Sequence, residues 1–191
     1  MRGQDVRTPC GAVLFDDPVL DKPCSFAIEL VRHQYSGNAK QVIQGIGGVP
    51  CVYVHPIRAL VWLIDDRLYA PKGDGKRKRD HGRDMLTSVV YHKPLPLQAV
   101  LMDPWSATKA LMWFIESFQK GDYCPLKANR HGDDSSGQQP HQRVAALSWT
   151  AADLTHGKRI KSTGFPQAHK VQLCQVVSPH RTDSVVTNAL S

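Results

Sequence analysis

Two aspartates follow strongly apolar segments, and their side chains are the first candidates for chemistry in this chain. Asp103 comes directly after the run 99–102, and Asp17 comes with Asp16 after the run 12–15. A carboxylate at the carboxyl end of a buried strand is a frequent position for a functional group in α/β proteins. If the two strands are neighbours in a sheet, the side chains converge, and the pattern then predicts a metal site.

Convergent carboxylates indicate chemistry on phosphodiesters. Mg²⁺ takes oxygen ligands and usually only one or two carboxylates per ion. Two ions about 3.5–4 Å apart can clamp an in-line displacement at phosphorus. Capping of turns or helix N-termini is the other common role of an aspartate after a strand, and it is the alternative interpretation of both residues. Asp65 and Asp66 also follow an apolar run, and we expect them in the turn that ends that strand.

Two basic segments are candidates for contacts with phosphate, because Lys and Arg gain by displacing counterions from a polyanion and the net charge is +7. Residues 71–83 form a polar block that we predict to be a surface loop. It contains four consecutive cations: Lys76, Arg77, Lys78 and Arg79. A second segment alternates as a strand would, with Lys158, Arg159 and Lys161. A solvated loop is the alternative interpretation of the first segment.

Other site chemistries find no support in the sequence. The five cysteines are an odd number without a C-x-x-C pair, so neither a disulfide framework nor a zinc site is indicated. None of the nine histidines has a partner at H-x-x-x-H spacing, which favours ordinary surface histidines. Signatures of serine hydrolases, P-loop proteins and dinucleotide-binding proteins are absent as well.

The elements that position these residues follow from the hydrophobic pattern. Strands are predicted at 12–16, 49–54, 59–64, 97–102 and 123–127. We expect the strands at 49–54 and 59–64 to pair in an antiparallel hairpin. Helices are predicted at 25–32, from 84 for about two turns, and from 105 to a stop at Lys120–Gly121. We expect a bend at 45–48, a long loop over 129–142, and a β-rich last third with strands at 143–149, 159–161, 170–177 and 184–187.

Length and composition predict a packed protein. With 191 residues, 41% of them hydrophobic and 21% charged, one domain with a real core is the default. No apolar stretch approaches the roughly 20 residues that span a bilayer. The first residues also lack the apolar core of a secretory signal, so we expect a cytoplasmic protein without a membrane contact.

Five segments carry a shared pattern that is more specific than any single acid. They are Phe15-Asp-Asp-Pro-Val-Leu-Asp-Lys22, Ile28-Glu-Leu-Val-Arg-His-Gln-Tyr-Ser-Gly-Asn38, Val100-Leu-Met-Asp-Pro-Trp-Ser-Ala-Thr-Lys109, Tyr123-Cys-Pro-Leu-Lys127 and His180-Arg-Thr-Asp-Ser-Val-Val-Thr-Asn188. Together they resemble transposases of bacterial insertion sequences, in the insertion-sequence-four-like group with a DDE catalytic domain.

The resemblance implies a particular fold and organisation. The fold class is α/β, an RNase H-like mixed sheet with flanking helices and a β-rich insertion, incomplete at the C-terminal end. Residues 1–191 then form a partial DDE domain, with core elements at 11–128, the insertion at 129–178 and the last core strand at 182–188.

The resemblance also implies a site. In the family, three acids hold two Mg²⁺ ions, for which Mn²⁺ is a possible substitute, and the site cleaves DNA and joins strands. Asp17 matches the first acid, with Asp16 beside it as a further ligand, and Asp103 matches the second. The third acid, a Glu, is expected on a helix beyond Ser191. DNA at transposon ends is the implied partner, along with self-association or association with an intact transposase.

The leading hypothesis is therefore a truncated transposase that is inactive alone. Loss of one carboxylate leaves one ion under-coordinated and misplaces the nucleophile. One alternative is a non-catalytic DNA-binding or interaction remnant of a transposase. Another is a product without a stable fold, because a sheet that lacks its closing helix exposes apolar surface.

Overall fold

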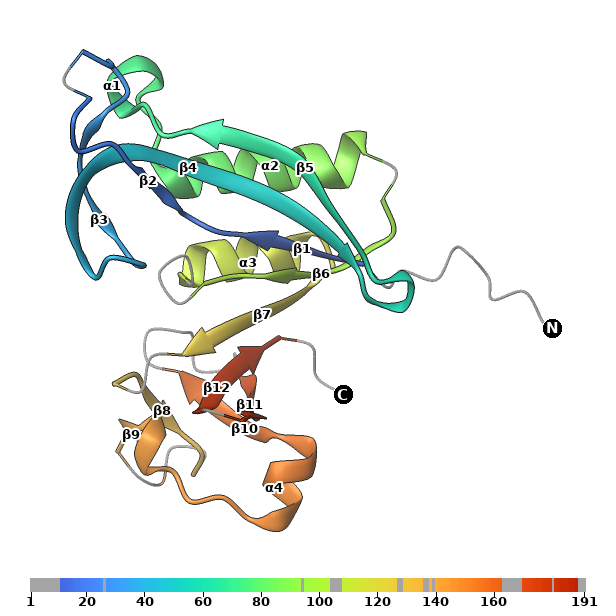
Figure 1. Cartoon of the computed structure of the whole chain (residues 1–191). Helices are drawn as coiled ribbons and strands as arrows, with labels where there is room; N and C mark the ends of the chain where they lie inside the picture. The colour runs from blue at the N-terminus through green and yellow to red at the C-terminus, as the bar shows by residue number, and fades with distance from the viewer. Residues whose placement is uncertain are drawn as a thin grey trace. The chain divides into compact units, whose positions relative to one another are not determined.

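The structure, a computed structural model, divides into two compact units, residues 1–98 and 99–191, which are described separately (Figure 1). The residues that it describes are 11–25, 27–93, 95–103, 108–126, 129–135, 138, 140–162, 170–179 and 181–188. Both units combine strands with helices, so the predicted α/β class is confirmed. The RNase H-like arrangement, and the division into a core at 11–128 and an insertion at 129–178, stay predictions.

A strand of 15 residues, β4 (Gln41–His55), organises unit 1. Four strands pair with it in antiparallel fashion: β1 (Gly11–Phe15), β2 (Val19–Asp21), β3 (Arg32–Ser36) and β5 (Leu60–Leu68). Both β2 and β3 reach Gly45, so they lie on opposite edges of β4. In Figure 1, β4 curves strongly along its length.

The glycines that were expected to mark a bend lie inside β4, which runs through them. A Cβ on Gly45 would lie 2.4 Å from the carbonyl oxygen of Leu20 in β2. Glycine here permits a close approach of two backbones, and the strand therefore continues where the apolar pattern is interrupted.

The predicted antiparallel hairpin is confirmed as β4 and β5. A 3-10 turn, η1 (Pro56–Arg58), joins them, and Ala59 closes it in the left-handed region with φ of 50°. The placement of Asp65 and Asp66 in the next turn is wrong, because both lie within β5. Asp65 pairs with Arg67, two residues along the same strand face, with both oxygens 3.2 Å from guanidinium nitrogens.

The block 71–83 is not a loop, and this prediction is wrong. Its first part forms α1 (Pro71–Asp74), and α2 (Lys78–His92) begins only a few residues later. A local hydrogen bond supports the start of α2: the carboxylate of Asp80 accepts from the backbone N–H of Arg77 at 2.8 Å. Charged residues near a helix start satisfy backbone groups that a loop would leave to water.

The predicted helix near 84 exists but is longer than expected, and Asp84 is not its cap. Asp84 lies inside α2, where its carboxylate is 2.6 Å from the ammonium of Lys76. Pro94, which was expected to end the helix, lies outside the described residues.

The predicted helix at 25–32 is wrong. The described part of this segment forms turns. The N–H of Ser25 donates to the carbonyl of Lys22 at 3.3 Å, and the N–H of Val31 donates to the carbonyl of Ile28 at 3.0 Å. The chain then enters β3 at Arg32. Eight residues are too few for a stable helix unless an apolar face is buried, and Ile28 is exposed.

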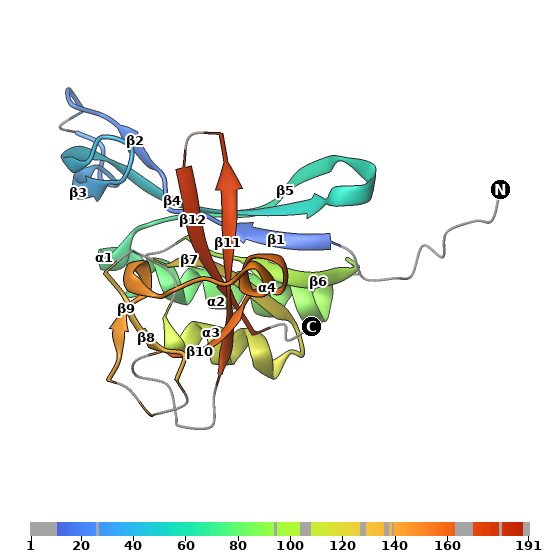
Figure 2. The same ribbon diagram turned by 90° about the horizontal axis from the view of Figure 1, so that it is seen from below.

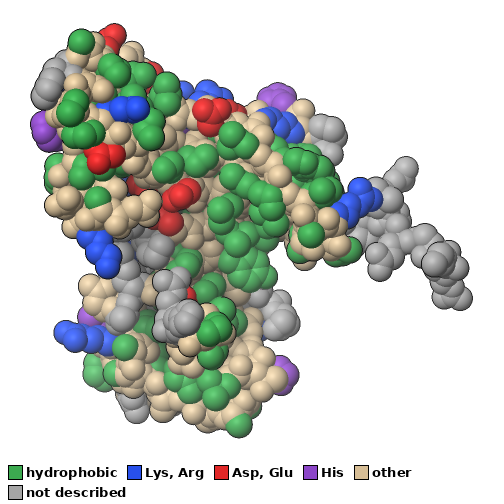
Figure 3. Space-filling view, viewed as in Figure 1, with side chains coloured by type: hydrophobic (Ala, Val, Ile, Leu, Met, Phe, Trp, Pro, Cys, Tyr) green, Lys and Arg blue, Asp and Glu red, His purple; other side chains and the backbone are tan. Residues whose placement is uncertain are grey.

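The core of unit 1 lies between α2 and the sheet. Helix α2 packs against β4, and its buried apolar side chains recur at helical spacing: Met85, Leu86 and Val89. Strands β1 and β4 contribute Val13, Cys51 and Tyr53, all fully buried. Figure 3 shows hydrophobic side chains exposed over β4 and β5. Three consecutive residues of β5, Val61, Trp62 and Leu63, are exposed.

Unit 2 is built around a sheet that starts with a parallel pair. Strand β6 (Leu97–Leu101), whose first two residues belong to unit 1, pairs in parallel with β7 (Gly121–Leu126). Helix α3 (Lys109–Ser117) connects them and packs on β7. The sheet continues in antiparallel order through β12 (Arg181–Thr187), β11 (Val171–Ser178) and β10 (Lys158–Ser162). Figure 2 shows β11 and β12 as a long hairpin.

The boundaries of α3 differ from the expected ones. The hydroxyl of Thr108 accepts a hydrogen bond from the N–H of Leu111 at 3.4 Å and caps the helix start. The helix ends at Ser117, with Phe118 as its C-cap, and not at Lys120–Gly121. Gly121 already belongs to β7. The earlier predicted start, residues 105–107, lies outside the described part of the chain.

The last third is only partly β-structured. The expected strands near 159–161, 170–177 and 184–187 are confirmed as β10, β11 and β12. The segment 143–149 is not a strand but holds a 3-10 turn, η2 (Val144–Ala146). A short helix that was not predicted, α4 (Ala151–His156), follows a capping box made by Thr150 and Asp153. Two short strands, β8 (His131–Asp133) and β9 (Gln142–Arg143), pair where a loop was expected.

Among the described residues, no helix is long and apolar enough to cross a membrane.

Candidate nucleic-acid interface

The two candidate acids occupy the same position relative to their strands. β1 ends at Phe15 and Asp17 follows two residues later, while β6 ends at Leu101 and Asp103 follows two residues later. Both side chains are partly accessible to solvent. They belong to different units, and the surroundings of each are given within its own unit.

Asp17 lies beside a lysine from the start of α2. Its carboxylate oxygen Oδ2 and its carbonyl oxygen are each 3.5 Å from Nζ of Lys78. Its backbone N–H donates to the carboxylate of Asp16 at 2.8 Å. The Asp17 side chain is 45% exposed, and a pair this accessible contributes about 0–1 kcal/mol to stability. The contact therefore holds the Lys78 and Asp17 side chains beside each other and adds little to the stability of the fold.

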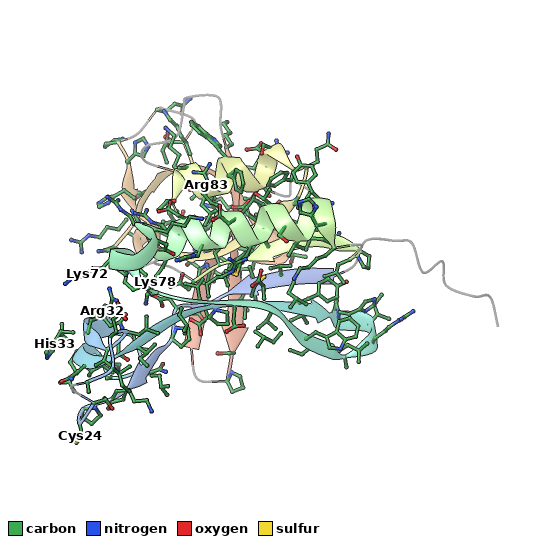
Figure 4. The ribbon with its side chains drawn as sticks, turned by 90° about the horizontal axis from the view of Figure 1, so that it is seen from above. Cys24, Arg32, His33, Lys72, Lys78 and Arg83 are labelled. Carbon is green, nitrogen blue, oxygen red and sulfur yellow. The ribbon has the colours of Figure 1, made fainter. Side chains whose placement is uncertain are left out.

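Lys78 also contacts an aromatic ring that is shared with an arginine. Nζ of Lys78 and Cζ of Arg32 each lie 5.5 Å from the ring centroid of Tyr69. Both distances are within the range of cation–π attraction. Figure 4 shows Arg32, Lys72 and Lys78 at the same end of unit 1.

The basic segment concentrates the charge of unit 1. Residues 72–83 hold six Lys or Arg and two Asp, a net of +4, and unit 1 as a whole holds 14 Lys or Arg against 10 Asp or Glu, also +4. The first turn of α2 adds backbone N–H groups and the positive end of the helix dipole. A polyanion therefore meets its strongest attraction in this unit at the start of α2.

The four cations predicted to contact DNA have different surroundings. Lys76 is held by Asp84, and that hydrogen bond raises the pKa of the Lys76 ammonium. Arg77 is the N-cap of α2, and Arg77 and Arg79 are both exposed. Lys78 is half-buried and contacts Asp17 and Tyr69. A contact of these residues with DNA stays a prediction.

The second basic segment is partly neutralised. Nζ of Lys158 is 2.8 Å from a carboxylate oxygen of Asp134, 3.4 Å from one of Asp153 and 2.6 Å from the carbonyl oxygen of Ser148. The hydrogen bond to Asp134 is the main reason that the pKa of Lys158 is raised. Arg159 and Lys161 lie on the strand face opposite to Lys158. Arg159 is exposed and Lys161 is half-buried.

Asp103 has buried polar neighbours in unit 2. Burial, together with the negative charges of Asp122 and Asp103, raises the pKa of the Cys124 thiol to about 12. Both carboxylates are thus close enough to Cys124 to raise the pKa of its thiol. The residue before Asp103, Met102, donates its N–H to the carbonyl of Tyr123 at 3.0 Å, which ties this loop to β7.

Asp122 is fully buried and bonds reciprocally with Asn188. Its N–H donates to the side-chain oxygen of Asn188 at 2.8 Å, and the N–H of Asn188 donates to its carboxylate at 2.9 Å. The Asn188 amide also donates to the carbonyl of Lys120 at 3.2 Å. These bonds join the start of β7 to the end of β12.

Sequence reasoning missed Asp122, Asn188, Arg32 and Tyr69. The only signal for Asp122 was an acid inside an otherwise apolar strand. Arg32 and Tyr69 are 37 positions apart in segments without a basic run, and no spacing rule joins them.

A divalent metal site needs several oxygen ligands at one point. In unit 1 the Asp17 carboxylate lies 3.5 Å from the ammonium of Lys78. Over the described ranges no three His, Cys, Asp or Glu side chains gather to hold a metal, and no catalytic step is assigned to a metal. The assignment of Asp17, Asp16 and Asp103 as metal ligands stays a prediction.

Comparisons with known proteins give a distant likeness. No protein-family model and no curated protein matches the sequence. A piggyBac transposase, in a synaptic complex with hairpin DNA, is 11% identical over 94% of this chain with a TM-score of 0.47. Endonuclease V of Ciona intestinalis, in complex with a 24mer DNA containing an inosine followed by a ribo-adenosine, is 11% identical over 97% of this chain and 76% of its own, with a TM-score of 0.43. The chain spans about a third (33%) of the piggyBac transposase chain. A likeness this distant assigns no role to any residue.

Proposed function

We propose that this chain is a DNA-processing protein of the transposase type that binds DNA phosphate through the start of α2. The observation that carries the proposal is the contact of Lys78 with Asp17, 3.5 Å between ammonium and carboxylate. It places a cation of the most basic segment beside an acid that follows a strand. The resemblance of the segments around Asp17 and Asp103 to insertion-sequence transposases supports the class.

The charge distribution explains why DNA is the partner. Phosphate contacts need exposed cations and free backbone N–H groups, and helix N-termini are frequent phosphate-binding positions. The start of α2 offers both, with Arg77 and Arg79 exposed. Binding that depends on such contacts weakens steeply with salt, because each phosphate contact releases counterions.

A second candidate function adds cleavage and strand transfer. It takes Asp17, Asp16 and Asp103 as ligands of Mg²⁺ or Mn²⁺ in an RNase H-like sheet, where the ions would supply charge neutralisation at the phosphodiester. The observation that favours it is the shared position of Asp17 and Asp103, each two residues after a strand. Association with a second copy or with a related transposase belongs to this candidate.

The DNA-binding proposal is tested with fluorescently labelled duplex DNA and the full chain at 50–200 mM salt, a range chosen at roughly the physiological ionic strength. We expect binding that weakens with salt, and a combined Arg77→Gln and Arg79→Gln variant whose salt slope is smaller by about 0.9 for each lost contact. Arg58→Gln is the matched control, because Arg58 is an exposed cation of the same unit outside the basic segment. No binding by the wild type at the lowest salt, or equal losses in the control, would contradict the proposal.

The cleavage candidate has a separate readout. End-labelled DNA is incubated with the protein in Mg²⁺, Mn²⁺ or EDTA, and nicked products are resolved on a denaturing gel. The candidate predicts metal-dependent nicking by the wild type that is lost in both Asp17→Asn and Asp103→Asn, while both variants still bind DNA. Binding without nicking removes cleavage and leaves the binding function alone.

A further inference from the structure

We infer that Arg32, Tyr69 and Lys78 form an anion site that holds one phosphate group of a nucleic-acid strand next to Asp17. The inference rests on the proposed DNA-binding function and deepens it. It adds Arg32 and Tyr69, which lie outside the basic segment, and it names a point on the surface where a particular phosphate is held.

Three elements bring the site together. Arg32 is the first residue of β3, Lys78 is the first residue of α2, and Tyr69 follows β5. The N–H of Tyr69 donates to the carbonyl of Gly47 at 2.9 Å, which anchors this residue to the central strand β4. Since both cationic groups lie 5.5 Å from the centre of the Tyr69 ring, they are within twice that distance of each other. The same ring is thus contacted by two positive charges, one from β3 and one from α2.

The charge at this point is only partly balanced by protein carboxylates. Lys78 has Asp17 as its acidic neighbour. For Arg32, the described residues provide no carboxylate partner. Its Nε is enclosed by protein atoms without a hydrogen-bond acceptor, so its other guanidinium nitrogens are the ones left for a ligand. The guanidinium charge of Arg32 is therefore left for an anion.

Phosphate suits both groups. A guanidinium group presents planar N–H donors that match phosphate oxygens, and an ammonium group adds a point charge with three donors. Lys78 contacts Asp17 as well as the ring, so a phosphate on this site would lie beside that acid. The basic residues of 72–83 continue from the site along the surface, and Figure 4 shows Lys72 near Arg32 and Lys78. An extended run of cations fits a strand of linked phosphates better than an isolated small anion.

The first measurement is the affinity of the full chain for a labelled single-stranded oligonucleotide. We expect Arg32→Gln to weaken binding about tenfold, the effect of one charge-assisted hydrogen bond, and to lower the salt slope by about 0.7. Tyr69→Leu removes the ring that positions both cations and should weaken binding, whereas Tyr69→Phe keeps the ring and should bind as the wild type does. Arg58→Gln is again the charge-matched control.

A second measurement reads the site directly. The Nε–H signal of Arg32 in a ¹⁵N spectrum is identified by its loss in Arg32→Gln and followed during titration with inorganic pyrophosphate and with the oligonucleotide. A shift with both ligands, together with the weaker binding of Arg32→Gln, supports the inference. If Arg32→Gln lowers the melting temperature, Arg32→Lys keeps the charge and should restore most of the binding.

The outcomes separate the two proposals. DNA binding that Arg32→Gln and Tyr69→Leu leave unchanged, with no shift of the Arg32 signal, overturns this inference and leaves the proposed function intact. A shift with pyrophosphate in a protein that binds no DNA supports the anion site, overturns its nucleic-acid ligand and overturns the proposed function. Equal losses in Arg58→Gln overturn the inference, because the effect would then be one of net charge.

Discussion

The chemical character of the two strand-end acids depends on their immediate neighbours. Asp17 faces the ammonium of Lys78, with its carboxylate 3.5 Å from Nζ. The charge of Asp103 acts on the buried thiol of Cys124 in β7. The same position after a strand therefore faces a lysine in unit 1 and acts on a buried thiol in unit 2.

The cysteines should differ sharply in reactivity. Burial raises the pKa of the Cys51 and Cys124 thiols to about 12 in each case, while Cys24 is exposed. Because the thiolate is the reactive form, iodoacetamide at pH about 8.5, the ordinary thiol pKa, should label Cys24 and spare the other two. The raised pKa values also mean that the folded protein keeps protons that the unfolded chain loses. Stability should therefore fall as pH rises from about 8.5 toward 12.

Peptide mass spectrometry after timed labelling measures this difference. Labelling in guanidinium chloride is the control, because unfolding should equalise Cys24, Cys51 and Cys124. A native protein in which Cys124 reacts as fast as Cys24 would contradict the burial of β7.

At the scale of elements, short polar interactions decide where helices begin. Asp80 bonds the backbone of Arg77 at the start of α2, and Thr150 bonds Asp153 at the start of α4. Hydrogen bonds from the backbone and side chain of Thr150 lower the pKa of Asp153. This contribution is present above the ordinary Asp pKa and is lost as pH falls through the lowered value. In the charged block 71–83, the bond from Arg77 to Asp80 supports the start of α2 at Lys78.

Close backbone packing is the second constraint on the elements. We expect Gly45→Ala to destabilise the protein by about 1–3 kcal/mol, because its Cβ would overlap β2, 2.4 Å from the Leu20 carbonyl oxygen. Gly37→Ala is the matched control, since a Cβ there meets nothing within 4 Å, and it should change stability by less than about 0.5 kcal/mol. Denaturant unfolding followed by circular dichroism measures both. Equal midpoints for the two variants would contradict the packing of β2 on β4.

At the scale of the whole molecule, each unit has its own buried core and its own share of charge. Unit 1 buries Tyr53, Met85 and Leu86, and unit 2 buries Ile115, Ile160 and Leu173. The net charge divides into +4 and +3, since unit 2 holds 10 Lys or Arg against 7 Asp or Glu. The basic character is thus shared, but in unit 1 it is concentrated on one helix start.

Separate cores predict separate local stabilities. Asn188→Ala removes the acceptor of the buried Asp122 N–H, and such a loss costs about 1–3 kcal/mol. Hydrogen exchange should therefore speed up in β7 and β12 of unit 2 and stay unchanged in β1 and β4 of unit 1. Asn129→Ala is the control, because Asn129 is an exposed asparagine of the same unit. Equal acceleration in both units would mean that they unfold as one.

The sequence by itself determined the β4–β5 hairpin, the strands before Asp17 and Asp103, and the basic segment. These features depend on neighbouring residues, since apolar runs, β-branched residues and turn residues act over a few positions. The helix at 25–32 and the loop at 71–83 were predicted wrongly. In segments this short, the spacing of apolar residues does not distinguish helix from turn or loop, and hydrogen bonds at the ends of the segment decide which one forms.

Only the tertiary structure decided which side chains meet. Lys78 and Asp17 are 61 positions apart, and Asn188 and Asp122 are 66 positions apart. Arg32 reaches Tyr69 because β3 and β5 pair with the same strand, β4. Local sequence sets the conformation of each segment, but the burial of apolar faces against one another sets which segments are neighbours, and the candidate phosphate site exists only at that level.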